Sequence, residues 1–216
     1  KNFTVKTGSD GIALVTWDMP DKSMNVFTEE VIEELGRIVD QVTADAAVKG
    51  VVITSGKESF SGGADLTMLQ RMLGQFHAEE AKDHKKAIAL LFDGAGRMSH
   101  LFRRIETSGK PWVSAINGTC MGGAFELSLA CHGRVAADSE KVKMALPEIK
   151  VGLFPGAGGT QRVPRLANTQ EALQMLTSGQ TLSPKKAKAM NLINDIVEPG
   201  RLIDAAKAMI AAGLKP

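Results

Sequence analysis

Two glutamates stand in surroundings where a carboxyl group can take part in proton transfer. Glu126 lies in the stretch 117–131, whose residues after Gly123 are apolar almost all the way round a predicted helix. A carboxylate there loses several kcal/mol of hydration unless it is paired, hydrogen-bonded or protonated, and the resulting raised pKa suits proton transfer. A structural role is equally compatible with this stretch, with the helix dipole or an arginine as partner. Glu148 precedes a loop rich in glycine and proline.

Glycine-rich turns precede three predicted helices. One turn contains Gly122 and Gly123, and another is the segment 59–66, where Asp65 is placed to cap the next helix. Backbone N–H groups in such turns can face a ligand oxygen, although most of them only redirect the chain. The loop 146–162 lacks the Gly-Lys-Ser/Thr ending of a P-loop and the acidic residue expected after a dinucleotide motif. The glycines therefore do not indicate a nucleotide site.

Alternating and helical patterns predict the elements that must position these residues. Strand patterns at 3–5 and 12–17 flank a turn, and a helix follows Thr28 with apolar residues at helical spacing through Val42. The apolar run 50–54 is typical of a strand buried on both faces, and the β-branched and aromatic residues of 112–116 predict another strand. Strand, helix and strand in this order predict an α/β architecture.

The rest of the chain is predicted to alternate between long helices and short strands. Helices are expected at 67–76, 78–106, 124–131, 169–177, 183–190 and 200–213, and strands at 134–137 and 141–144, which makes the last fifty residues all-helical. The buried side of the 78–106 helix is predicted to be formed by Ala87, Ile88, Leu91, Phe92, Ala95, Met98, Leu101, Phe102 and Ile105. Four of the large side chains are expected in the core or, alternatively, in a tunnel wall: Met68, Met72, Met98 and Phe102.

Composition excludes several classes of protein. A chain of 216 residues is expected to form one domain, and a net charge of +2 gives no reason to expect nucleic acid or an anionic membrane as partner. Cys120 and Cys131 have neither a zinc spacing nor a disulfide framework, and the four histidines form no ligand spacing, so no metal is predicted. The chain has no long apolar run and no signal-like start, so we expect a soluble protein of the cytoplasm or another reducing compartment.

Three segments in this order resemble the crotonase, or enoyl-CoA hydratase/isomerase, family. They are 61–66 (Ser-Gly-Gly-Ala-Asp-Leu), 117–126 (Asn-Gly-x-x-x-Gly-Gly-x-x-Glu) and 147–162 (Pro-Glu-x-x-x-Gly-x-x-Pro-Gly-Ala-Gly-Gly-Thr-Gln-Arg). The resemblance implies an α/β spiral of ββα units, with a core at about 1–166 and a helical part at about 167–216. It also implies acyl-CoA thioester substrates and an oxyanion hole formed by the N–H groups of Ala64 and Gly123.

The same resemblance assigns roles to further residues. It implies that Glu126 activates a water molecule, that Glu148 delivers a proton to the α-carbon, and that the Gly156 N–H helps to hold the water. The backbone of Gly62, Ala64 and Leu66 resembles the part that holds the CoA adenine, and the acyl end is expected to meet Met68, Met72 and Phe102. Two glutamates favour a 2-enoyl-CoA hydratase, while a 3-enoyl to 2-enoyl isomerase or other crotonase chemistry is the alternative.

The resemblance also suggests a larger assembly. The chain is most similar to the N-terminal hydratase part of multifunctional β-oxidation proteins, so a linker and an NAD-dependent 3-hydroxyacyl-CoA dehydrogenase domain are expected to follow, with a thiolase as partner and a homo-oligomer possible. No cofactor is expected in this domain. A remote alternative is RNA binding, as in one relative of the family, through a basic face of Lys82, Lys85, Lys86, Lys185, Lys186 and Lys188.

Overall fold

The main sheet has six strands in the computed structural model, which describes residues 1–216. Its first two strands are antiparallel and all the others are parallel. The central strands are buried along nearly their whole length, as their continuous apolar runs predict. The spatial order is β1 (Phe3–Thr7), β2 (Ile12–Trp17), β3 (Gly50–Ser55), β4 (Trp112–Ile116), β6 (Gly133–Ala137) and β8 (Asp195–Val197).

A second, shorter ladder runs through the turns that follow these strands. It contains β5 (Cys120–Met121) paired with β7 (Met144–Ala145), and it continues through single bridges from Phe27 to Ala64, Ser61 to Cys120 and Met144 to Leu182. Each repeat therefore adds one strand to the main sheet, one short segment to the second ladder, and then a helix. This is the predicted spiral of ββα units.

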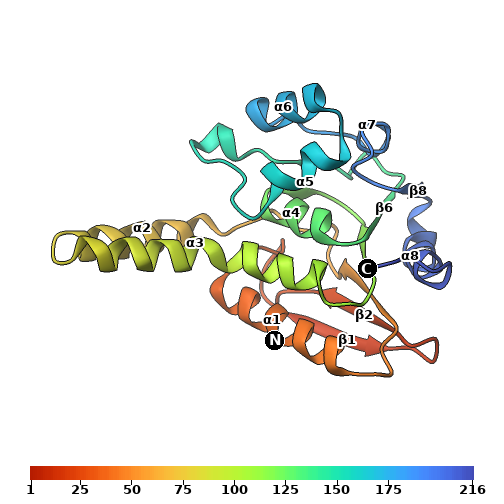
Figure 1. Ribbon diagram of the computed structural model, residues 1–216. Helices are drawn as coiled ribbons and strands as arrows, with labels where there is room; N and C mark the ends of the chain where they lie inside the picture. Colours follow the sequence, from red (N-terminus) through yellow and green to blue (C-terminus); the bar gives the residue numbers. More distant parts are fainter.

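The helices lie around the main sheet (Figure 1). The helix α4 is buried at all eight of its residues, as its lack of a polar face predicts. Figure 1 shows α2 and α3 as a long hairpin that projects from the body of the molecule. The helices and 3-10 turns are α1 (Glu29–Ala44), α2 (Leu66–Glu80), α3 (His84–Glu106), α4 (Gly123–Ala130), η1 (Glu148–Val151), α5 (Gly159–Leu166), α6 (Thr169–Ser178), α7 (Pro184–Ala189), η2 (Pro199–Arg201) and α8 (Leu202–Ala211). None of them combines the length and the apolar character needed to cross a bilayer.

The projection of the hairpin corrects the prediction for its apolar side. Leu101, Phe102 and Ile105 are buried where the end of α3 packs on the body, but Ile88 and Phe92 are 49% and 70% exposed. Helical periodicity shows which residues share a face, but it does not show whether anything covers that face. The break between the two helices lies at residues 81–83 rather than at 77, because the side chain of Asp83 caps α3.

Two predictions about the second half of the chain were wrong. The final part is not all-helical, because Asp195–Val197 pairs with β6 and extends the main sheet. The predicted strand at 141–144 is reduced to Met144–Ala145, since Val142 donates its N–H to Ser139 in a turn and cannot continue a ladder. The helices predicted at 124–131, 169–177, 183–190 and 200–213 are confirmed within a few residues.

Asn25 ties the first repeat to the second, and its replacement should be costly. Its buried side chain accepts the Met19 N–H at 3.0 Å and donates to the carbonyl oxygen of Trp17 and the hydroxyl of Ser55 at 2.9 Å each. Asn25→Leu leaves the buried Met19 N–H without an acceptor and removes the two donated hydrogen bonds, so we expect a loss of about 3 kcal/mol in the free energy of unfolding. Urea denaturation measures it, and a loss below about 1 kcal/mol would contradict this role.

Candidate active site

The second ladder brings Ala64 and Gly123 to the same place. Ser61 bridges Cys120 in parallel, with hydrogen bonds of 2.9 and 3.1 Å on either side of the bridge. Ala64 and Gly123 each follow three residues after these partners, so the two turns leave the ladder together. A Cβ atom built on Gly123 would lie 3.9 Å from the amide nitrogen of Ala64.

Both amides have the properties of free donors. The Ala64 N–H donates to no other backbone group, and Gly123 opens α4, where the first N–H groups have no acceptor within the helix. Gly63 makes this approach possible, because its φ is +94° and a Cβ atom there would lie 2.7 Å from the carbonyl oxygen of Met121. The structure thus brings together the two amides predicted to form an oxyanion hole.

Glu126 points from α4 toward the start of α5 and is only 2% exposed. Its Oε1 accepts the N–H of Ala157 at 2.8 Å and the N–H of Gly159 at 2.7 Å. The first turn of α5 also carries a positive partial charge, which favours a carboxylate. The other oxygen, Oε2, accepts no hydrogen bond from the protein, so it is available to a substrate or a water molecule.

Glu148 reaches the same region from the 3-10 turn η1. A Cβ atom on Gly122 would lie 3.1 Å from Glu148 Oε1, and Gly122 O in turn accepts the backbone N–H of Glu126 at 3.0 Å. The second oxygen of Glu148, Oε2, is buried and has no hydrogen-bond partner. A buried carboxyl oxygen without a partner is costly, which makes this atom a candidate for contact with a substrate or a water molecule.

The surroundings raise the pKa of both carboxyl groups. Burial has the largest effect on the pKa of Glu126 and raises it, and the negative charge of Glu148 raises it further. The N–H groups of Gly159 and Ala157 and the charge of Arg162 lower it, so the pKa is about 7. Burial also raises the pKa of Glu148 above its ordinary 4.5. Glu126 can therefore exchange a proton near neutral pH, and the charge of Glu148 couples the two groups.

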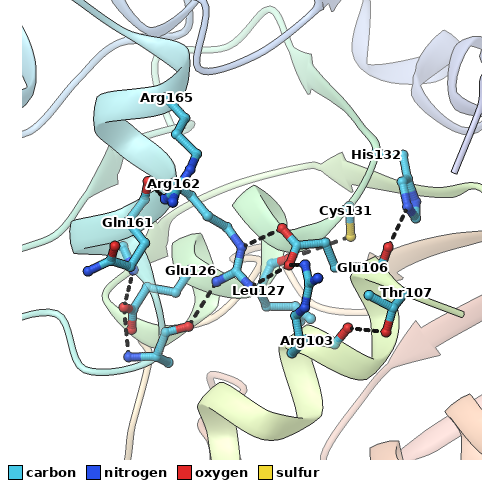
Figure 2. Close-up of polar contacts among 12 residues, drawn as sticks. Arg103, Glu106, Thr107, Glu126, Leu127, Cys131, His132, Gln161, Arg162 and Arg165 are labelled. Atoms are coloured by element: carbon cyan, nitrogen blue, oxygen red, sulfur yellow. Dashed lines mark hydrogen bonds and ion pairs between the residues drawn. The ribbon is translucent and has the colours of Figure 1, made fainter.

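Sequence reasoning missed the residues that hold Glu126. Ala157, Gly159 and Arg162 belong to the recognised third segment, but their contact with Glu126 depends on how α5 packs against α4. Figure 2 shows Arg162 paired with Glu106 of α3, beside the loop that receives Glu126. The signal available in the sequence was a glycine-rich turn before a helix, which can bind an anion but does not reveal which one.

The other predicted site residues lie around this centre. Gly156 directly precedes the two donors, and its N–H donates to no backbone acceptor. The Gly62 N–H is used by the carbonyl oxygen of Asn25, so only the Gly62 carbonyl can meet a ligand. Leu66 is 57% exposed at the start of α2, whereas Met68 is buried.

A mainly apolar cavity of about 150 Å³ lies between α2 and α3, with Glu29 and Ile32 of α1 also in its wall. Met68, Met72 and Met98 are among its lining residues. The methyl carbon of Met98 lies 2.5 Å from the position that a Cβ atom on Gly123 would take. The predicted alternative of a tunnel wall is therefore compatible with the position of these methionines, whereas Phe102 is fully buried in the core.

A ββα spiral that sets two backbone amides beside one buried and one half-buried carboxyl group matches the class predicted from the three sequence segments. Residues 7–214 match the family model described as enoyl-CoA hydratase/isomerase. The chain therefore belongs to the enoyl-CoA hydratase/isomerase family, and its fold is the crotonase fold.

Relatives support this assignment along the whole chain. The chain is 41% identical over its full length to the fatty acid oxidation complex subunit alpha of Shewanella amazonensis, and 40% identical over 95% of its length to that of Idiomarina loihiensis. It spans only 29% and 27% of those proteins. Among solved structures, the enoyl-CoA hydratase of Bacillus anthracis superimposes with a TM-score of 0.82 at 27% identity, covering 98% of this chain and 76% of that one. DspI of Pseudomonas aeruginosa gives 0.81 at 29% identity, covering 98% and 79%.

Proposed function

We propose that this domain hydrates trans-2-enoyl-CoA thioesters to 3-hydroxyacyl-CoA in fatty-acid β-oxidation. The observation that carries the proposal is the convergence of Glu126, which is buried, and Glu148, which is half-buried, beside the amides of Ala64 and Gly123, with the pKa of both carboxyl groups raised. The names of the relatives, fatty acid oxidation complex subunit alpha and enoyl-CoA hydratase, support the same assignment.

The two amides would stabilise the charge that develops on the thioester oxygen. When the oxygen of the deprotonated water bonds to C3, the electrons of the double bond move to the carbonyl oxygen and form an enolate. Two fixed N–H donors in a site shielded from solvent stabilise such an oxygen by about 3 kcal/mol each. The Ala64 and Gly123 amides fit this role because their positions are set by backbone pairing rather than by flexible side chains.

The two carboxyl groups carry out different proton transfers. Ionised Glu126, through its free Oε2, takes a proton from the water whose oxygen bonds to C3. Protonated Glu148 then gives its proton to C2, which returns the enolate to a thioester and leaves one added water across the double bond. The proton gained by Glu126 must pass to Glu148 before the next turnover, which suits two groups that titrate together.

Incubation with crotonyl-CoA tests this proposal. Loss of the enoyl absorbance together with formation of 3-hydroxybutyryl-CoA is the expected result. Conversion of a 3-enoyl-CoA to a 2-enoyl-CoA without hydration would replace the hydratase by the isomerase alternative. Release of free CoA would indicate thioester hydrolysis instead, and no reaction with any of these substrates would contradict the proposal.

Nucleic-acid binding has little support. Three lysines of the basic face predicted from the sequence are neutralised by carboxylates, in the pairs Lys86–Glu79, Lys186–Glu171 and Lys188–Asp195. Paired lysines release few counterions from a phosphate backbone. A gel shift that is absent at low salt would remove this alternative.

The cavity between α2 and α3 is our candidate for the acyl end of the substrate. A Cβ atom on Gly94 would lie 3.0 Å from the sulfur of Met72, inside this cavity, so Gly94→Ala should shorten it. We expect kcat/KM for a long 2-enoyl-CoA to fall about tenfold relative to crotonyl-CoA, the usual discrimination for one methyl group in an apolar pocket.

Gly96→Ala is the matched control for this prediction. It makes the same change two residues along α3 and gains the same helix propensity, about 1 kcal/mol. Its Cβ atom would meet only the exposed ring of His100, at 3.2 Å. Equal chain-length profiles for the two variants would rule out this cavity as the acyl site.

The setting of the domain in a longer protein is also a proposal. The relatives of 41% and 40% identity are more than three times as long as this chain. We propose that the domain acts beside an NAD-dependent 3-hydroxyacyl-CoA dehydrogenase and with a thiolase, because the product proposed here is the substrate that such a dehydrogenase oxidises. Co-purification of the full-length protein with these two activities tests the arrangement.

A further inference from the structure

Arg162 makes three hydrogen bonds that connect α3 to the loop before α5. Its Nε and Nη2 donate to the two oxygens of Glu106 at 3.1 and 3.2 Å, and its Nη1 donates to the carbonyl oxygen of Ala157 at 3.0 Å. The Arg162 side chain is only 12% exposed. A two-pronged pair of this kind fixes the plane of the guanidinium as well as its position.

The peptide held by Arg162 lies between the two donors to Glu126. The N–H of Ala157 donates to Glu126 at 2.8 Å and the N–H of Gly159 donates to it at 2.7 Å. The Ala157–Gly158 peptide lies between these two N–H groups in the chain. The backbone angles on either side of this peptide set how the two N–H groups are placed relative to each other, and Arg162 restricts those angles by holding the Ala157 carbonyl oxygen. The contact is close enough to require glycine, since a Cβ atom on Gly158 would lie 2.0 Å from Arg162 Nη1.

We infer that Arg162, anchored by Glu106, is a positioning residue that fixes the loop 157–159 and thereby the direction in which Glu126 presents its free oxygen. Figure 2 shows the chain of contacts from Glu106 through Arg162 to the loop and Glu126. Arg162 touches no reacting atom in this scheme. The inference rests on the proposed function only in taking Glu126 as the base.

Charge reinforces the geometric effect of Arg162. The charged groups around Glu126 are Glu148 from η1, Arg162 from α5 and, behind Arg162, Glu106 and Arg103 from α3. Among them, Arg162 lowers the pKa of Glu126 and Glu148 raises it. Removing the Arg162 charge should therefore move the Glu126 pKa further upward, and loosening the two N–H donors should act in the same direction.

Three variants test the inference, all in the complete chain. Arg162→Met removes the charge and the three hydrogen bonds. Arg162→Lys keeps the charge, but its ammonium group cannot make the paired hydrogen bonds of the guanidinium to Glu106. Arg165→Met is the control, because Arg165 lies on the same helix, is exposed and bonds only the backbone of Gln161. If Arg162→Met does not fold, Arg162→Gln takes its place, since its amide can still donate to Ala157.

The measurements are the pH profile of kcat and a direct NMR titration of the Glu126 carboxyl carbon, assigned with Glu126→Gln. For Arg162→Met we expect kcat at pH 7 to fall about 100-fold with KM little changed. The midpoint of the kcat profile and the midpoint of the Glu126 NMR titration should both move upward by about one pH unit. Arg162→Lys should lie between this variant and the wild type, and Arg165→Met should equal the wild type.

A further comparison separates a positioning role from a general loss of stability. Glu106→Gln should lower kcat in the wild type but have little additional effect in Arg162→Met, because Glu106 acts through Arg162. A folded neutral variant at position 162 with an unchanged Glu126 titration would overturn the inference. The NMR titration needs no turnover, so a wild-type chain without hydratase activity would refute the proposed function and leave this test intact.

Discussion

Glu126→Gln and Glu148→Gln should each lower kcat for the hydration of crotonyl-CoA by about 10³-fold or more, because general acid–base catalysis contributes factors of 10² to 10⁴. Glutamine keeps the size and the acceptor oxygen of the side chain, so the contacts of Ala157 and Gly159 with residue 126 should survive. What is lost is the ability to accept or donate a proton. KM should change much less than kcat, since the thioester oxygen is held by backbone amides.

The double variant should be hardly worse than either single variant. The two carboxyl groups are proposed to act on one water and one substrate, and groups that act as a unit give strongly non-additive losses. Glu140→Gln is the control, because Glu140 is exposed in the turn after β6. Full activity in Glu148→Gln would remove that residue from the mechanism, and additive losses would mean that the two groups act in separate steps.

The sequence was sufficient to predict the parts of the site that depend on local chain geometry. The glycines at 62, 63, 122 and 123 mark turns where the backbone must come close to another segment, and Gly63 and Gly122 adopt the positive φ that favours glycine. The apolar residues around Glu126 predicted a buried carboxyl group, and the structure confirms that burial. Each of these properties is encoded within a few residues.

The parts that sequence reasoning missed depend on packing between distant elements. Glu106 and Arg162 are 56 residues apart, and nothing in either local pattern indicates that α3 and α5 meet. Ile88 and Phe92 have the spacing of a buried face, yet they lie on the projecting part of α3. The strand β8 was missed because its three residues gain their structure from the free edge of β6 rather than from their own pattern.

Glu126→Gln should also make the protein more stable at pH 8, by about 3 kcal/mol. In the folded wild type, burial is the main cause that raises the pKa of Glu126 to about 7 from its ordinary 4.5, and this separation corresponds to about 3 kcal/mol of free energy. At pH 8 the wild type must therefore keep a poorly solvated negative charge. The neutral amide avoids that cost and keeps the acceptor oxygen for Ala157 and Gly159.

The pH dependence gives this prediction its sign. Below about pH 4.5 the carboxyl group carries its proton in both the folded and the unfolded chain, so wild type and variant should be equally stable there. Between about pH 4.5 and 7 the unfolded chain loses the proton first, and the wild type loses up to about 1.4 kcal/mol of stability per pH unit relative to Glu126→Gln. Above about pH 7 the difference should stay constant.

Urea denaturation of both proteins at a series of pH values from 4 to 8 measures this difference. The exposed control Glu140→Gln should stay within about 0.5 kcal/mol of the wild type at every pH. A difference between Glu126→Gln and wild type that is independent of pH would mean that residue 126 affects packing and not charge. The expected result is that the stability difference between Glu126→Gln and wild type increases with pH and that Glu126→Gln has lost hydratase activity. The same carboxyl group would then both destabilise the fold when charged and carry out the proton transfer.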